Sequence, residues 1–130
     1  MKILVVDDER DIQVLFEQRF RKEIRNGEIQ LVFAFSGEEA LTFLQSSDHE
    51  AILILSDINM PGMSGLDLLS RIKTKYKAPP PVVMMITAYG DAEKYNEAMR
   101  LGANDFLHKP LDFSTLKQRL LNLNASDEAG

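Results

Sequence analysis

Acidic side chains follow two short apolar segments of this sequence. Asp7 and Asp8 come directly after residues 2–6, and Asp57 comes shortly after the apolar run of residues 51–55. A run of this kind, too short to cross a membrane, is typical of a buried parallel strand. Because ligands in open α/β sheets bind at the carboxyl ends of the strands, we expect the three carboxylates to meet at one edge. Asp57 is therefore a candidate nucleophile.

Carboxylates that meet in this way need a compensating charge. Two unit charges about 4 Å apart repel each other by about 4 kcal/mol at an effective dielectric constant near 20. A shared proton could offset this repulsion, but a hard divalent cation does so better, because it binds carboxylate and carbonyl oxygens and keeps several waters. We expect Mg²⁺, with Asp8 and Asp57 as direct ligands and Asp7 as a candidate ligand through water.

Two more residues at predicted strand ends, Thr87 and Lys109, could complete a phosphoryl-binding site. A carboxylate beside Mg²⁺ and an ammonium group can accept a phosphoryl group as an aspartyl phosphate. Such transfer depends mostly on positioning and charge. In this interpretation the metal and Lys109 each neutralise one phosphoryl oxygen, the Thr87 hydroxyl bonds a third, and the small Ala88 leaves room for the group. The motifs contain no general base, so we predict slow self-hydrolysis and no turnover enzyme.

Alternating strands and helices must position these residues. The expected strands lie at residues 2–6, 30–35, 51–57, 82–86 and 106–108. The expected helices are a long one that stops near residues 26–27, one opened by the capping pattern at residues 36–39, and those at residues 65–76, 91–101 and 112–122. Five strands with five crossover helices predict an α/β fold, a flavodoxin-like doubly wound parallel sheet of order 2-1-3-4-5. The second strand is less uniformly apolar, which favours an edge position.

Composition limits the classes of protein to consider. The chain has 130 residues, a formal net charge of -5 and no cysteine. This length suits one domain, expected at residues 1–123, followed by a flexible tail or the start of a linker at residues 124–130. Scattered basic residues argue against a nucleic-acid surface, and the first apolar run is too short for a signal peptide or membrane anchor. We expect a cytoplasmic protein with no membrane partner.

The motifs, taken in order, resemble the receiver domain of two-component response regulators over residues 1–122. Those that carry the resemblance are Val-Val-Asp7-Asp8-Glu9, Asp57-Ile-Asn59-Met60-Pro61-Gly62, Ile86-Thr87-Ala88, and Gly102-Ala103-Asn104-Asp105-Phe106 before Lys109-Pro110. The resemblance implies that Asp57 receives its phosphoryl group from a phosphohistidine on a partner histidine kinase or phosphotransfer protein. It also implies that the backbone carbonyl of Asn59 joins the three aspartates around Mg²⁺. The peptide bond between Lys109 and Pro110 is expected to be cis.

The resemblance further implies a switch in which Thr87 moves toward the phosphate and Phe106 swings inward. Many receivers carry tyrosine at the position of Phe106, so the switch here can act only sterically. Tyr89 is expected to lie over the site and hinder attacking water. The predicted helix at residues 91–101 has a thin apolar stripe, so an added charge could re-pose it.

The face formed by this helix, the fifth strand and the last helix is the expected readout surface. It would contact a downstream protein or an appended effector domain, and a homodimer that forms on phosphorylation is a further expectation. The chain could be a stand-alone regulator or a part of a longer one.

Other interpretations fit parts of the pattern. Asp7 and Asp8 alone could merely cap the following helix. A phosphohydrolase of the haloacid-dehalogenase type also uses an aspartyl phosphate, but its nucleophile follows the first strand. A degenerate receiver that only docks would not need the complete set of acidic, threonine and lysine residues. A flavin or nucleotide binder would carry a glycine-rich phosphate loop, which is missing from the predicted strand ends.

Overall fold

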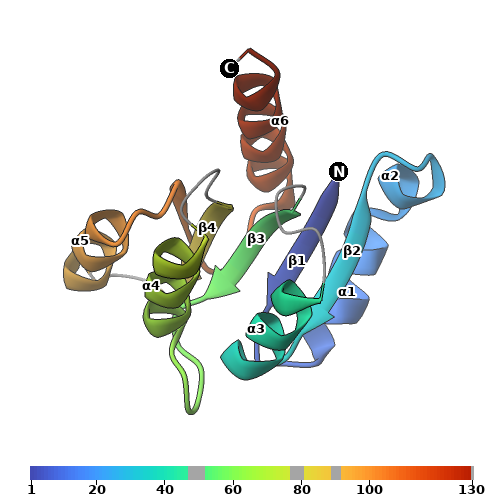
Figure 1. Cartoon of the computed structure of the whole chain (residues 1–130). Coiled ribbons are helices and arrows are strands. Elements are labelled where there is room, and N and C mark those ends of the chain that lie inside the picture. Colours follow the sequence, from blue (N-terminus) through green and yellow to red (C-terminus); the bar gives the residue numbers. More distant parts are fainter. Residues whose placement is uncertain (47–51, 77–80, 89–91, 130) are drawn as a thin grey trace.

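Five parallel strands form the centre of the structure, a computed structural model that describes residues 1–46, 52–76, 81–88 and 92–129. The strands are β1 (Lys2–Val6), β2 (Gln30–Ala34), β3 (Ile52–Asp57), β4 (Val82–Thr87) and β5 (Asp105–His108). Their order in the sheet is β2-β1-β3-β4-β5, which confirms the predicted topology and the edge position of the second strand (Figure 1). The strand order reverses between β1 and β3, where Asp7 and Asp57 lie.

Helices cover both faces of this sheet (Figure 1). On one face lie α3 (Gly37–Gln45), α4 (Gly65–Lys75) and α5 (Ala92–Arg100). On the other face α1 (Asp11–Arg19) and α6 (Phe113–Ala129) pack side by side, and α2 (Arg21–Arg25) follows α1. Successive strand residues alternate between the two faces, and each face has its own apolar core. This two-sided burial explains why the central strands are apolar throughout.

Serine side chains begin two of the helices. Ser36 Oγ accepts a hydrogen bond from the backbone N–H of Glu39 at 3.1 Å, which confirms the capping pattern predicted there. Ser64 Oγ accepts one from Asp67 N–H at 3.1 Å and starts α4 in the same way. Each cap satisfies a backbone donor that the first helical turn leaves unpaired.

The prediction of one long first helix is wrong, because the helix is interrupted in its middle. The structure divides it into α1 and α2 at Phe20, whose backbone angles (φ -105°, ψ 15°) depart from helical values. The Phe20 ring is fully buried, whereas the nearby Leu15 and Ile24 are more than one-third exposed. The break lets Phe20 reach the core, a tertiary effect that helical spacing does not reveal.

The predicted end of the last helix near residue 122 is also wrong. Helix α6 continues to Ala129. Residues 123–129 contain no glycine or proline, and the first glycine is Gly130. Polar composition alone is a weak reason to end a helix, because Ala, Glu and Leu all favour helical backbone.

The thin apolar stripe predicted for the fourth helix is confirmed in α5. Ala98 is the one fully buried residue of this helix, and Tyr95 and Met99 are largely exposed. Asp91, expected to start the helix, lies outside the described residues. No helix in the described part of the chain has the length and the apolar composition needed to cross a membrane.

Candidate functional site

Three carboxylates meet at the carboxyl edge of the sheet, as the sequence predicted. Asp7 directly follows β1, Asp8 comes next, and Asp57 is the last residue of β3. Each offers an oxygen, and these oxygens all lie within 4.8 Å of one another. Asp7 and Asp57 are each only 5% exposed, whereas Asp8 is open to solvent. The cluster therefore has a buried floor and one solvent-facing ligand.

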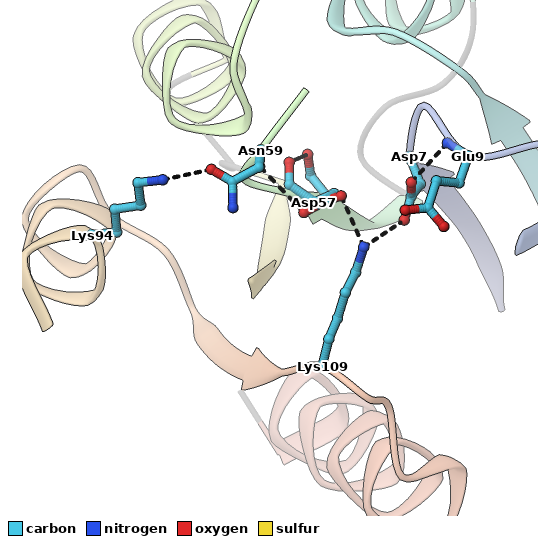
Figure 2. A network of polar contacts seen from close by, with 7 residues as sticks. Asp7, Glu9, Asp57, Asn59, Lys94 and Lys109 are labelled. Carbon is cyan, nitrogen blue, oxygen red and sulfur yellow. Dashed lines mark hydrogen bonds and ion pairs between the residues drawn. The ribbon is translucent and has the colours of Figure 1, made fainter. Parts of the chain in front are cut away.

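The ammonium of Lys109 closes one side of this cluster. Its Nζ atom lies 3.0 Å from Asp57 Oδ2 and 3.4 Å from Asp7 Oδ2 (Figure 2). The backbone N–H of Lys109 donates to the carbonyl oxygen of Thr87 at 2.7 Å, which fixes the loop after β5 against β4. The peptide bond between Lys109 and Pro110 is cis, as expected. One lysine thus contacts both buried carboxylates.

Burial and charge act in opposite directions on the ionisation of this group of side chains. Burial raises the pKa of Asp57 above its ordinary value, and the neighbouring charge of Asp7 adds to the rise, although Lys109 opposes it. Burial lowers the pKa of Lys109, but its hydrogen bonds and charge interactions with Asp57 and Asp7 outweigh burial, so the pKa is raised overall. A further positive charge at the site therefore stabilises the ionised form of Asp57.

Thr87 ends β4 at the same edge. Asp57 pairs with Ile86 across the sheet, so Thr87 lies one residue beyond the acid on the neighbouring strand. Its side chain is 1% exposed, and its Oγ1 atom has no hydrogen-bond partner among the described residues. A buried hydroxyl without a partner is costly and rare in folded proteins. The next residue, Ala88, is exposed and small.

Phe106 lies on β5, behind this edge. It is 8% exposed and belongs to the apolar core on the face of the sheet that α3, α4 and α5 cover. Its ring contacts those of Tyr95 and His108, with centroid distances of 5.0 and 5.4 Å. Tyr89, which was expected to cover the site, lies outside the described residues.

The loop from β3 to α4 holds Asn59 beside the acidic cluster. Asn59 N–H donates to Asp57 Oδ1 at 3.2 Å, as Glu9 N–H does to Asp7 Oδ1 at 2.9 Å (Figure 2). The loop closes when Gly65 N–H donates to Ile58 O at 2.8 Å. These backbone donors orient the two buried carboxylates.

Sequence reasoning missed one polar residue next to the site. Lys94 Nζ donates to the side-chain oxygen of Asn59 at 2.5 Å (Figure 2). Lys94 is half-buried and lies on a helix with no motif around it, and only the packing of α5 brings it near Asn59. Nothing in the sequence signals this contact.

The donor set fits a hard divalent cation. It consists of carboxylate oxygens with one acidic group open to solvent, and it contains no sulfur or imidazole ligand among the described residues. Hard cations of the Mg²⁺ type bind through one or two carboxylates and keep several waters. The Thr87 hydroxyl on the adjacent strand has no partner among the described residues, so it is available to donate a hydrogen bond to an oxygen atom of a group bound at the same edge.

Comparison with known proteins identifies the family. The sequence matches the response regulator receiver domain over residues 3–121. It is 35% identical over 120 residues to chemotaxis protein CheY-3 of Vibrio cholerae, and the aligned region covers 92% of this chain and 88% of that protein. It is 36% identical over 134 residues to response regulator protein FleR of Pseudomonas aeruginosa, and the aligned region covers 99% of this chain but only 27% of FleR.

The chain also spans only 32% of another relative, a protein-glutamate methylesterase/protein-glutamine glutaminase of Rhodospirillum rubrum. Among solved structures, the receiver domain of NtrX from Brucella abortus superimposes with a TM-score of 0.76 at 32% identity. That match covers 92% of this chain and 95% of the NtrX chain. The fold, the acidic edge and these matches agree: the chain belongs to the response regulator receiver domain family of two-component signalling proteins.

Proposed function

We propose that Asp57 is the phosphoacceptor of a two-component phosphorelay. The observation that carries this proposal is the placement of Asp57 at the strand edge, buried and held between Lys109 and two further carboxylates. A carboxylate with a raised pKa at the carboxyl edge of a doubly wound sheet is a candidate functional group. Its Oδ2 atom already contacts a cation that could neutralise a transferred phosphoryl group.

The proposed reaction is an in-line transfer. A carboxylate oxygen of Asp57 forms a bond to phosphorus as the bond between phosphorus and a histidine nitrogen of a partner kinase or phosphotransfer protein breaks. The histidine nitrogen keeps the electron pair. Water later attacks phosphorus, which restores the Asp57 carboxylate and releases inorganic phosphate. We propose slow autodephosphorylation and not substrate turnover, because the receiver domain family acts in signalling.

The other residues of this edge bind Mg²⁺ or neutralise the negative charge of the phosphoryl group. Mg²⁺, held by Asp7, Asp8, Asp57 and the Asn59 carbonyl, supplies positive charge to the phosphoryl oxygens when it is bound. Lys109 supplies a second positive charge.

Thr87 donates its unpartnered hydroxyl to a phosphoryl oxygen, and Ala88 keeps the approach open. Thr87 and Phe106 form the proposed switch, which acts on the face made by α5, β5 and α6. That face is the proposed contact for a downstream protein, an appended effector domain or a second copy of the chain. The net charge of -5 supports a domain that does not itself contact nucleic acid.

Phosphorylation by acetyl phosphate tests the proposal. The protein is incubated with acetyl phosphate and Mg²⁺, and its intact mass is measured. We expect one added phosphoryl group in the wild type, and none in Asp57→Asn or in wild type treated with a metal chelator. Phosphorylation of Asp57→Asn to the wild-type extent would refute the assignment of Asp57.

A further inference from the structure

A lysine of α5 reaches the loop that carries Asn59. Lys94 Nζ donates to Asn59 Oδ1 at 2.5 Å, and the extended Lys94 side chain points toward that residue (Figure 2). The backbone N–H of the same asparagine donates to Asp57 Oδ1 at 3.2 Å. Asn59 therefore connects the proposed phosphoacceptor to α5 by two consecutive hydrogen bonds.

Apolar packing holds α5 only loosely. Ala98 is its one fully buried residue, and Tyr95 and Met99 are 44% and 41% exposed. An element with few buried contacts has a low cost of local displacement. The hydrogen bond between Lys94 and Asn59 is then one of the few contacts outside the apolar core that fix the position of this helix.

The residue next to Lys94 connects α5 to a second part of the sheet. The Tyr95 ring lies edge-on to the Phe106 ring of β5, with 5.0 Å between the centroids. Lys94 and Tyr95 are consecutive residues of one helix, so a movement that shifts Lys94 relative to Asn59 also shifts Tyr95 relative to Phe106. The helix thus bridges the acidic loop and β5.

We propose that the hydrogen bond between Lys94 and Asn59 couples the charge at Asp57 to the position of α5, with Lys94 as a positioning residue. This inference rests on the proposed function. A phosphoryl group on Asp57 adds negative charge and strong acceptor oxygens two residues away from Asn59. These oxygens compete with the neutral amide oxygen of Asn59 for the Lys94 ammonium, because ionised acceptors form the stronger hydrogen bonds. The preferred position of α5 changes with the partner of Lys94.

Three variants separate this coupling from a general charge effect. Lys94→Met removes the ammonium and keeps a flexible stem. Lys94→Arg keeps a cationic donor. Arg100→Met is the matched control, because Arg100 lies on the same helix and pairs with Glu97 one turn earlier.

Amide exchange across residues 92–100 provides the readout. It is measured in each protein without ligand and with Mg²⁺ plus beryllofluoride, a mimic of the phosphoryl group. The readout is the ratio of the exchange rates without and with beryllofluoride. We expect this ratio to be about threefold to tenfold closer to one in Lys94→Met than in the wild type, which is the size expected for one charged hydrogen bond at an exposed site. Lys94→Arg should restore most of the ratio, and Arg100→Met should keep the wild-type value.

A double-mutant cycle tests the pair itself. In an Asn59→Ala background, Lys94→Met should change the ratio less than it does in the wild-type background, because the hydrogen bond between the two residues is already missing. An unchanged ratio in Lys94→Met, an equal loss in Arg100→Met, or a wild-type ratio of one with the adduct formed overturns the coupling. Failure of the wild type to form the adduct overturns the proposed function instead, so the two failures are distinguishable.

Discussion

The Asp57 carboxylate lies where two physical effects oppose each other. Burial and the nearby charge of Asp7 favour its protonated form, and Lys109 favours its ionised form. Burial prevails, so the pKa of Asp57 is raised, and the folded protein keeps an ionised Asp57 at neutral pH only at a cost in stability. A metal ion or a phosphoryl group with its metal would relieve that cost, which links the chemistry of this residue to the stability of the domain.

Asp57→Asn should therefore stabilise the metal-free protein. A folded-state pKa raised above the ordinary value of 3.8 means that the folded state binds a proton more tightly than the unfolded state. The free energy of unfolding of the wild type then falls as pH rises from about 3.8 through the higher pKa of the folded state. Asp57→Asn lacks this decrease. We expect Asp57→Asn to be more stable by roughly 1 kcal/mol at pH 7, a fraction of the repulsion between two nearby charges.

Urea unfolding in the presence of a chelator, from pH 4 to pH 8, measures the difference. Asp67→Asn at the exposed start of α4 is the control, and it should not become more stable. A metal-free Asp57→Asn that is less stable than wild type at pH 7 would show that pairing with Lys109 outweighs burial.

Thr87→Val should separate stability from binding. The valine methyl replaces a buried hydroxyl that has no partner among the described residues, so unfolding of the metal-free protein should cost about 1 kcal/mol more. The affinity for beryllofluoride should fall about tenfold, because a hydrogen bond to a charged acceptor is lost.

Thr42→Val is the matched control, because its hydroxyl donates to Glu38 O and its loss brings no gain in stability. Denaturant unfolding and a beryllofluoride titration give the two values. A destabilised Thr87→Val with unchanged affinity would contradict the assignment of this hydroxyl to the phosphoryl group.

The β3–α4 loop depends on the close approach of two backbone segments. A Cβ atom at Gly65 would overlap the carbonyl oxygen of Asp57 and lie 2.7 Å from Ile58 Cα. At Gly37, by contrast, a Cβ atom would meet mainly the side chain of Met63, with Sδ at 2.7 Å. Backbone cannot yield as a flexible side chain can. Gly65 therefore holds the loop against the strand end that presents Asp57.

Gly65→Ala should be the more damaging of these two glycine substitutions. The overlap with backbone outweighs the gain of about 1 kcal/mol in helix propensity, and we expect a net loss of about 3 kcal/mol in unfolding free energy. Gly37→Ala should lose about 1 kcal/mol, because Met63 can move. Thermal or urea unfolding compares the two, and equal losses would mean that the loop adapts.

Elements differ in how far the sequence determines them. The buried strands, the Ser36 cap and the weak stripe of α5 follow from local patterns, and the structure confirms them. The break at Phe20 and the contact between Lys94 and Asn59 depend on how helices pack onto the sheet, which no spacing along one helix encodes. The gathering of Asp7, Asp8 and Asp57 could be predicted because strand ends and topology alone place them together.

The carboxyl and amino ends of the parallel strands carry different groups of polar side chains. The carboxyl edge gathers charges that oppose one another. At the opposite edge Asn104 Oδ1 accepts hydrogen bonds from Val83 N–H and from Lys73 Nζ, each at 2.9 Å. Lys73 Nζ also donates to Pro81 O at 2.8 Å, and burial lowers the pKa of this lysine. This network joins α4, β4 and β5 far from the acidic cluster.

Asn104→Ala should therefore reduce stability without changing the site. It leaves the Val83 N–H without its partner in a fully buried position, so we expect a loss of about 2 kcal/mol in unfolding free energy. The exposed Asn122 offers a control, and Asn122→Ala should change stability little. The Mg²⁺ affinity of folded Asn104→Ala, measured by calorimetry, should equal that of the wild type. A large change in affinity would mean that the two edges are coupled.

If Asp57 reversibly carries a phosphoryl group, that group can be located chemically in the reacted protein. After reaction with acetyl phosphate and Mg²⁺, borohydride reduction converts an aspartyl phosphate into homoserine, which peptide mass spectrometry assigns to a position. We expect homoserine at position 57 alone, and none when the metal is chelated. Homoserine at position 7 or 8, or at no position in a protein that stays folded, would contradict it.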